Sequence, residues 1–196
     1  MLKPQDVVLA LKLLCKQGEE WSQGGLAQEV VMSASEVNAG LKRLAYARLT
    51  ERQEDGRKWQ VVKPAIEEFL VHGIRYVFPA EKGAPAVGIP TAHAAFPLKL
   101  YLTSTPDPYP VWPTRLGKVK GYALVPLYTT VAQAALKDAA LYEWLSIVDA
   151  LRDPENETPD IARLALKDKL AGRLPASARE KLQERGDDHQ LDLLSL

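Results

Sequence analysis

The apolar and polar positions between residues 22 and 62 predict two short helices followed by two strands. In the first stretch the apolar residues fall three and four positions apart, on one helical face; they are Leu26, Ala27, Val30 and Val31. The pattern breaks at residues 32–34, where Ser33 or Ser35 can accept the free amide hydrogens of a new helix. This second helix is expected from about Ser35 to Ala47.

The second helix is amphipathic, and its two faces suggest different partners. Val37, Leu41 and Leu44 form an apolar stripe that must be buried. The opposite face is polar, small and basic, and consists of Ser35, Glu36, Asn38, Ala39, Lys42 and Arg43. Such a face is typical of a helix that reads the major groove of DNA, because Asn pairs with adenine and Arg or Lys with guanine. The small Ala39 and Gly40 would let the helix lie deep in the groove.

Two strand-like runs follow, at residues 49–53 and 58–62, joined through Asp55-Gly56, a strong hairpin signal. In this hairpin Arg52, Arg57 and Lys58 would contact DNA phosphates. Acidic neighbours offset their charge, and residues 1–63 hold 10 Lys and Arg against 8 Asp and Glu. Since phosphate neutralisation drives most DNA affinity, one copy should bind weakly and two copies on a palindromic site should bind better.

The segment ending in Leu44-Ala45-Tyr46-Ala47-Arg48-Leu49-Thr50 resembles the winged helix-turn-helix of MarR-like bacterial transcriptional regulators. In that family the recognition helix is followed by a Gly-Leu pair and then by the wing. Here Arg48 stands at the glycine position, where a left-handed backbone costs a residue other than glycine roughly 1 kcal/mol. The resemblance covers about the first 78 residues and implies DNA binding.

The flanks of this segment complete the first domain. An apolar face at helical spacing predicts a helix from about Lys3 to Lys16, with Pro4 near its first position. Residues 19–22 are expected to form a short edge strand in which Trp21 covers the core. After the wing, apolar residues at helical spacing predict a helix from Pro64 to about residue 78.

The composition changes between residues 79 and 126, which hold nine of the 14 prolines. Regular helix is excluded there, yet the stretch is too apolar for a disordered linker. We expect residues 79–128 to form an extended segment packed across the helices, with one short strand within residues 116–128. His93 has no carboxylate or cysteine close by in sequence, which favours a structural role over a catalytic one.

Helical patterns return in the last third of the chain. They predict helices over residues 131–136, 139–152, 159–171 and 176–185, the first capped by Thr129 or Thr130. The strong apolar stripe of the 139–152 helix is either core or partly a dimerisation surface, because alanines there would allow close helix approach. Residues 88–93, 121–128, 141–144 and 148–152 are similar to a group of uncharacterised bacterial proteins with the same N-terminal domain, and this similarity implies no activity.

Composition narrows the classes of function. The chain has 25 basic and 25 acidic residues, which argues against a protein that coats polyanions through bulk charge. Cys15 is the only cysteine, and its leucine neighbours favour a packed thiol over a redox sensor. No segment has the length of a transmembrane helix or the layout of a signal peptide, so we expect a cytoplasmic protein. The sequence contains no catalytic, metal-binding or cofactor motif, so we expect a protein that is not an enzyme and that binds no cofactor.

The sequence thus predicts a mainly α, α+β fold in three parts: a winged helix-turn-helix (residues 1–78), a Pro-rich extended segment (79–128) and a helical region (129–196). The expected function is sequence-specific binding of double-stranded DNA as a homodimeric bacterial transcriptional regulator, most simply a repressor. The residues expected at the DNA are Ser33, Ser35, Asn38, Lys42, Arg43, Arg52, Arg57 and Lys58. The alternative is a protein-interaction module, accessory or antitoxin-like, whose C-terminal half binds a protein partner.

Overall fold

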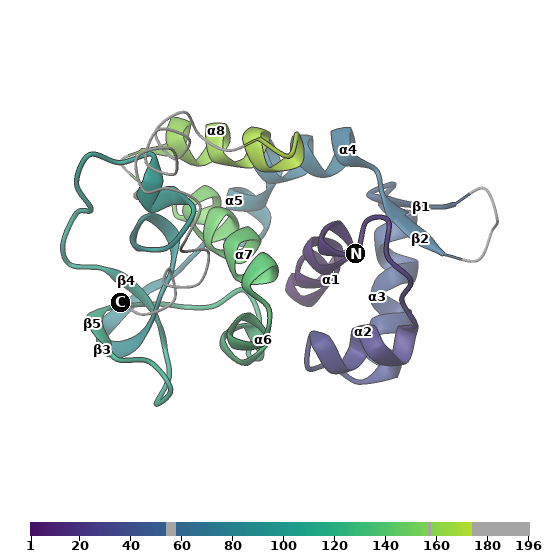
Figure 1. Ribbon diagram of the computed structural model, residues 1–196, viewed down its shortest axis with the longest axis horizontal. Coiled ribbons are helices and arrows are strands. Elements are labelled where there is room, and N and C mark those ends of the chain that lie inside the picture. Colours follow the sequence, from purple (N-terminus) through teal and green to yellow (C-terminus); the bar gives the residue numbers. More distant parts are fainter. Residues whose placement is uncertain (54–57, 157, 174–196) are drawn as a thin grey trace, which may run out of the picture.

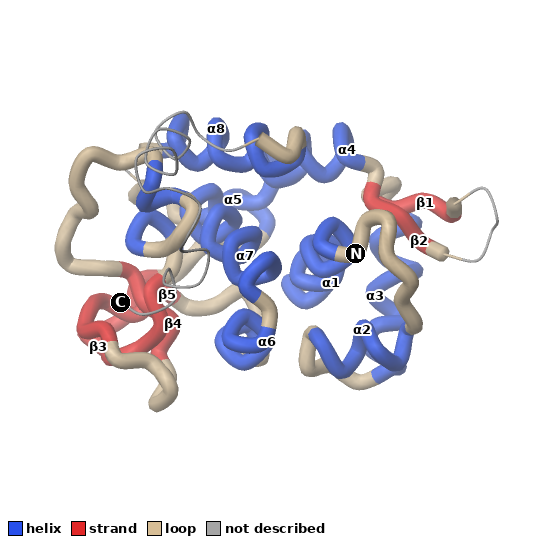
Figure 2. The backbone as a smooth tube through the Cα atoms, viewed as in Figure 1, coloured by secondary structure: helices blue, strands red, loops and turns tan. Residues whose placement is uncertain are grey.

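The computed structural model describes residues 1–53, 58–156 and 158–173 and shows a mixed α+β protein, as the sequence predicts. Strands occur in two places, β1 and β2 at one end of the molecule and β3 to β5 at the other, with helices between them (Figure 1; Figure 2). The helices are α1 (Pro4–Cys15), α2 (Gln23–Glu29), α3 (Ala34–Tyr46), α4 (Lys63–Glu68), α5 (Ile74–Val77), α6 (Val131–Lys137), α7 (Ala139–Arg152) and α8 (Pro159–Leu170). The strands are β1 (Thr50–Arg52), β2 (Trp59–Val61), β3 (Lys82–Pro90), β4 (Pro110–Pro113) and β5 (Val119–Leu124).

Helix α1 joins the two halves of the chain. Its residues from Val7 to Leu11 are at most 1% exposed, because the helix packs against α3 on one side and α7 on another. A helix that is apolar almost all round is buried all round. The N-terminal elements and the C-terminal helices therefore share one continuous hydrophobic core.

Side-chain caps define where α2 and α3 begin. The Ser22 hydroxyl accepts a hydrogen bond from the Gly25 amide, 3.0 Å away, and so starts α2. The edge strand expected at residues 19–22 is wrong: the chain there turns into the helix cap, although Trp21 does pack against the core. Ser33 caps α3 in the same way, and Glu36 completes a capping box by accepting from the Ser33 amide.

The end of α3 keeps the geometry of a glycine-terminated helix without the glycine. Arg48 has φ 60°, in the left-handed region. The Leu49 amide donates to the Leu44 carbonyl and the Arg48 amide to the Ala45 carbonyl, both at 3.0 Å, which is the hydrogen-bond pattern of a Schellman motif. Leu44 and Leu49 are both buried. The turn into β1 thus forms despite the backbone strain at Arg48.

Strands β1 and β2 pair antiparallel, with Thr50 opposite Val61 and Arg52 opposite Trp59. The Asp-Gly turn expected between them lies outside the described residues. The next predicted helix is present but interrupted. It runs as α4, a π-helical turn over Phe69–Gly73, and α5.

The Pro-rich region contains more strand than the one short run expected from its sequence. β3 pairs antiparallel with both β4 and β5, and β4 pairs parallel with β5, so that the three strands close into a small barrel. Glycine makes the closure possible. A Cβ at Gly88 would lie 2.0 Å from the Trp112 carbonyl oxygen, and one at Gly121 would lie 1.9 Å from the Tyr109 carbonyl oxygen.

Helix α7 is the core of the C-terminal half. Its apolar stripe is at most 8% exposed within a single chain, so the stripe is core and is not available as a dimerisation surface. Its buried Asp149 accepts hydrogen bonds from Thr91 (2.7 Å), Trp112 (2.6 Å) and Arg152 (2.8 Å). The bounds of α6, α7 and α8 agree with the sequence prediction, and the helix expected at 176–185 lies outside the described residues.

Candidate nucleic-acid interface

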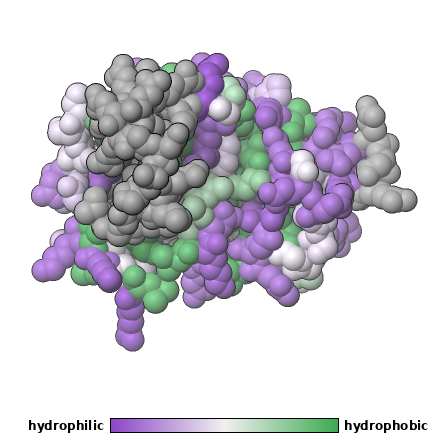
Figure 3. Space-filling model, in the orientation of Figure 1, coloured by the Kyte–Doolittle hydropathy of each residue, from purple (hydrophilic) through white to green (hydrophobic). Residues whose placement is uncertain are grey.

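One face of α3 is exposed and polar, as the sequence predicts. Ser35, Asn38 and Lys42 are exposed, whereas the opposite stripe of Val37, Leu41 and Leu44 is at most 1% exposed. Tyr46 continues the exposed face by one more turn and is 87% exposed. In the space-filling view the end of the molecule that carries these elements is covered mainly by hydrophilic residues (Figure 3). This face presents hydrogen-bonding groups outward from a rigidly packed helix.

The side chain of Ser33 is exposed but is engaged in the cap of α3. Its Oγ accepts from the Glu36 amide at 3.2 Å and donates to the Glu36 carboxylate at 2.9 Å. The Ser35 hydroxyl lies 3.0 Å from it. Ser33 therefore orders the first turn of α3, and Ser35 has the more available hydroxyl.

Arg43 does not lie on the outward face. Its guanidinium forms two hydrogen bonds to Asp6 of α1, Nε to Oδ2 at 2.7 Å and Nη2 to Oδ1 at 2.6 Å. The hydrogen bonds to Asp6 also raise the pKa of Arg43. Gly40, one turn earlier, is buried against Leu9, where a Cβ would lie 2.9 Å from Leu9 Cδ2. Gly40 and Arg43 thus belong to the face of α3 that packs on α1. The sequence pattern predicts both residues toward the DNA groove, and the structure corrects this prediction.

Two of the basic residues expected at the DNA phosphates, Arg52 of β1 and Lys58 just before β2, have partners within the chain. The Arg52 guanidinium lies over the Trp59 ring, 4.0 Å from its centroid. Lys58 forms an ion pair with Glu20. Arg57 lies outside the described residues. Arg52 is exposed and stacks on the indole.

The segment that connects β5 to α6 reaches the α2 and α3 pair, which the sequence did not predict. Tyr128 donates a hydrogen bond from its hydroxyl to Glu36 Oε1, at 2.9 Å. Thr130 donates from its Oγ1 to the Val30 carbonyl at 3.0 Å, in the connection between α2 and α3. Residues about 100 positions apart in sequence therefore meet at the first turn of α3 and in the connection before it, and only the tertiary structure could have placed them there.

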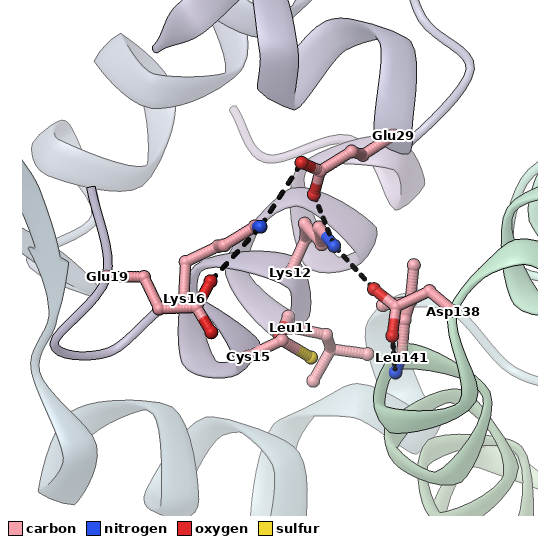
Figure 4. Close-up of polar contacts among 8 residues, drawn as sticks. All are labelled: Leu11, Lys12, Cys15, Lys16, Glu19, Glu29, Asp138 and Leu141. Carbon is pink, nitrogen blue, oxygen red and sulfur yellow. Dashed lines mark hydrogen bonds and ion pairs between the residues drawn. The ribbon is translucent and has the colours of Figure 1, made fainter. Parts of the chain in front are cut away.

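A second link between the halves is the ion-pair cluster around Lys12 (Figure 4). The Lys12 side chain is 5% exposed, and its ammonium lies between Glu29 of α2 and Asp138, whose carboxylate caps α7. Lys16 pairs with Glu29 and Glu19 at 3.2 Å each. The cluster therefore ties α1, α2 and the start of α7 together.

The cluster shifts the pKa values of its members in the directions that favour their charged forms. Burial by itself opposes the charge on all three groups, but the mutual hydrogen bonds outweigh it. The pKa of Lys12 is raised by its bonds to Asp138 and Glu29. The pKa values of Glu29 and Asp138 are lowered by their bonds to Lys12. Nearby, burial raises the pKa of the Cys15 thiol to about 12, and its Sγ donates to the Leu11 carbonyl, as expected of a packed thiol.

A pocket of about 470 Å³ opens beside the cluster. It is lined by Lys12, Cys15, Lys16, Glu19, Gln28, Glu29, Lys137, Asp138 and Ala140. Three cations and three anions line it, and most of them already form ion pairs with one another. The pocket therefore has no net charge that would select one class of ligand.

Within residues 1–53, 58–156 and 158–173 no three His, Cys, Asp or Glu side chains are grouped to hold a metal ion. No helix in the same ranges is long and apolar enough to cross a membrane. Comparison of the chain with family models, with curated proteins and with solved structures finds no match. Any function must therefore be argued from the geometry of the chain itself.

Proposed function

We propose that residues 1–78 are a winged helix-turn-helix that binds double-stranded DNA in a sequence-specific way, and that the chain acts as a homodimeric bacterial transcriptional regulator, most simply a repressor. In this proposal α2 and α3 are the helix-turn-helix, α3 is the recognition helix, and β1 and β2 are the wing. The carrying observation is the face of α3 formed by Ser35, Asn38 and Lys42, which is polar and exposed while the apolar stripe of the helix is buried against α1 and α2.

The packing decides which predicted residues remain candidates for reading bases. Asn38 and Lys42 are the side chains of α3 suited to adenine and guanine respectively. Arg43 is held by Asp6, and its role in the proposal is to fix α3 against α1. Arg52 would contact phosphate from the wing. Two copies are needed because each contributes few cations that are not already paired.

The test is selection of bound sequences from randomised duplex DNA, followed by mobility shifts over a range of salt concentrations. For Lys42→Ala or Asn38→Ala we expect a loss of about 1 to 3 kcal/mol and relaxed preference at one base pair. Arg52→Ala should weaken binding to all sequences alike and lower the salt slope by about one unit. The matched control is Lys118→Ala, which removes an exposed lysine near the barrel.

Each outcome separates the proposal from its rivals. Selection of a two-fold symmetric sequence, lost in Lys42→Ala and kept in Lys118→Ala, would support a dimeric regulator. Equal, sequence-independent losses for Asn38→Ala, Lys42→Ala and Arg52→Ala would remove the base-reading assignment. Failure to select any sequence at low salt would overturn the proposal.

A protein-interaction module is the second candidate, and the charge pairing favours it. Arg43 and Lys58 form ion pairs within the chain, which reduces the cations available to phosphate. The large exposed apolar side chains Tyr46 and Tyr76 are 87% and 76% exposed, and aromatic residues are enriched at protein interfaces. Purification of the chain with an endogenous protein at equal stoichiometry, together with no DNA selection, would decide for this candidate.

A further inference from the structure

We propose that Tyr128 is a positioning residue for the recognition helix, although it lies far outside the proposed DNA-binding domain in sequence. Its hydroxyl holds the Glu36 carboxylate in place, so that the carboxylate accepts a hydrogen bond from the exocyclic amino group of cytosine. The inference rests on the proposed function and deepens it, because it names a base that α3 reads and a residue in the C-terminal half on which that reading depends.

The contacts of Glu36 leave one place for a further donor. Its Oε2 accepts from the Ser33 amide at 3.0 Å and from the Ser33 hydroxyl at 2.9 Å. Its Oε1 accepts from the Tyr128 hydroxyl at 2.9 Å. An ionised carboxylate has about four acceptor positions, so one remains on Oε1. With both oxygens held from separate directions, the carboxylate has a fixed orientation.

The charge of Glu36 selects the kind of DNA group that can approach it. Hydrogen bonds from the Ser33 amide, the Ser33 hydroxyl and Tyr128 lower the pKa of Glu36, so it stays ionised near neutral pH. An ionised carboxylate repels phosphate and cannot face the acceptors of guanine or thymine. The donors of the major groove are the amino groups of cytosine and adenine, and carboxylates pair with cytosine because adenine presents an acceptor beside its donor.

Tyr128 is held firmly enough to position another residue. Two residues later, Thr130 is anchored to the Val30 carbonyl, and Val131, the first residue of α6, is fully buried. The phenol therefore projects from a fixed segment onto α3. A shift of that segment would move Glu36 relative to a bound base pair, whereas Ser35, Asn38 and Lys42 would keep their places on the helix.

The experiment repeats the selection from randomised duplex DNA with Tyr128→Phe and Glu36→Gln beside the wild-type chain. The wild type should select a C·G pair at one position of each half-site. Both variants should lose about tenfold of the preference for that pair while they keep the preferences at the other positions. The matched control is Tyr101→Phe, because the Tyr101 hydroxyl also donates to a carboxylate, that of Asp168 at 3.1 Å, on another part of the molecule.

The readout separates positioning from a structural role. A variant that is only less stable would lose affinity for all sequences alike and would show a lower thermal midpoint. If Tyr128→Phe selects the same base at every position as the wild type, the inference fails while the proposed function stands. If the wild type selects no sequence, the proposed function fails and the inference with it.

Discussion

The helices α2 and α3 begin at signals a few residues away, whereas the small barrel of β3 to β5 closes through residues far apart in the sequence. These two helices are each started by a neighbouring side chain, Ser22 for α2 and Ser33 for α3. In the barrel the ladders pair residues as remote as Lys82 and Leu124, and the strands are closed by parallel pairing of β4 with β5. Local signals therefore determine where α2 and α3 begin, whereas the barrel depends on residues that meet only after folding.

The largest effect should come from the buried network that holds the barrel to α7. Asp149→Ala leaves the Arg152 guanidinium, 3% exposed, without its carboxylate, and it removes the acceptor of Thr91 and Trp112. We expect a loss of about 3 to 5 kcal/mol in the free energy of unfolding, measured by urea titration. Asp160→Ala is the control, since its side chain is 91% exposed in an ion pair with Arg163 and should matter by less than about 0.5 kcal/mol. Similar losses in both variants would contradict the structural role of the network.

Replacement of a glycine by alanine should destabilise the protein in the barrel but not in a helix. Gly121→Ala places a Cβ against the Tyr109 carbonyl oxygen, and we expect it to cost about 3 kcal/mol. Gly24→Ala in α2 meets nothing within 4 Å and should be neutral or stabilise by up to about 1 kcal/mol. Urea midpoints of the two variants give the comparison directly. A barrel that accepted alanine at position 121 without loss would refute the close approach of the strands.

The ion-pair cluster around Lys12, which links the two halves of the chain, should make stability sensitive both to mutation of Lys12 and to pH. Lys12→Met leaves Glu29 and Asp138 without their shared ammonium and should cost about 2 kcal/mol at neutral pH. Since the folded state lowers the pKa of both carboxylates, their contribution is complete above their ordinary values near pH 4 and is lost as the pH falls through the lowered values.

The wild type should therefore lose stability below about pH 4 more steeply than Lys12→Met, as measured by urea midpoints between neutral and acidic pH. Lys137→Met is the control, because Lys137 lines the same pocket but is exposed. An unchanged acid dependence in Lys12→Met would show that the cluster does not couple protonation to folding.

The smallest effect concerns the strained residue after α3. Arg48→Gly relieves a positive φ in a turn whose hydrogen bonds are otherwise complete, and we expect a gain of about 1 kcal/mol. The same change from a basic residue to glycine at Lys42, inside α3, should instead cost about 1 kcal/mol. Thermal midpoints that move in opposite directions would confirm that the backbone, and not the lost charge, is responsible.

The sequence predicted the helices well because their signals are local. Apolar spacing located α1, α2 and α3, and cap residues and prolines located α6, α7 and α8 within a few positions. It was less successful in the Pro-rich region, where proline and glycine exclude helix but do not say which strands pair. The edge strand predicted at residues 19–22 is wrong, because Ser22 caps α2 and the single apolar residue Trp21 does not specify a strand.

In the candidate interface, too, some features follow from local sequence patterns and others only from the tertiary structure. The sequence by itself determined the exposed face of Ser35, Asn38 and Lys42, because helical periodicity fixes which side chains share a face. Only the tertiary structure decided that Arg43 binds Asp6, that Gly40 packs on Leu9 and that Tyr128 reaches Glu36. A periodic pattern says which residues lie opposite the apolar stripe, but residues at the edge of that stripe are assigned by whichever distant element packs beside them, and that depends on the fold as a whole.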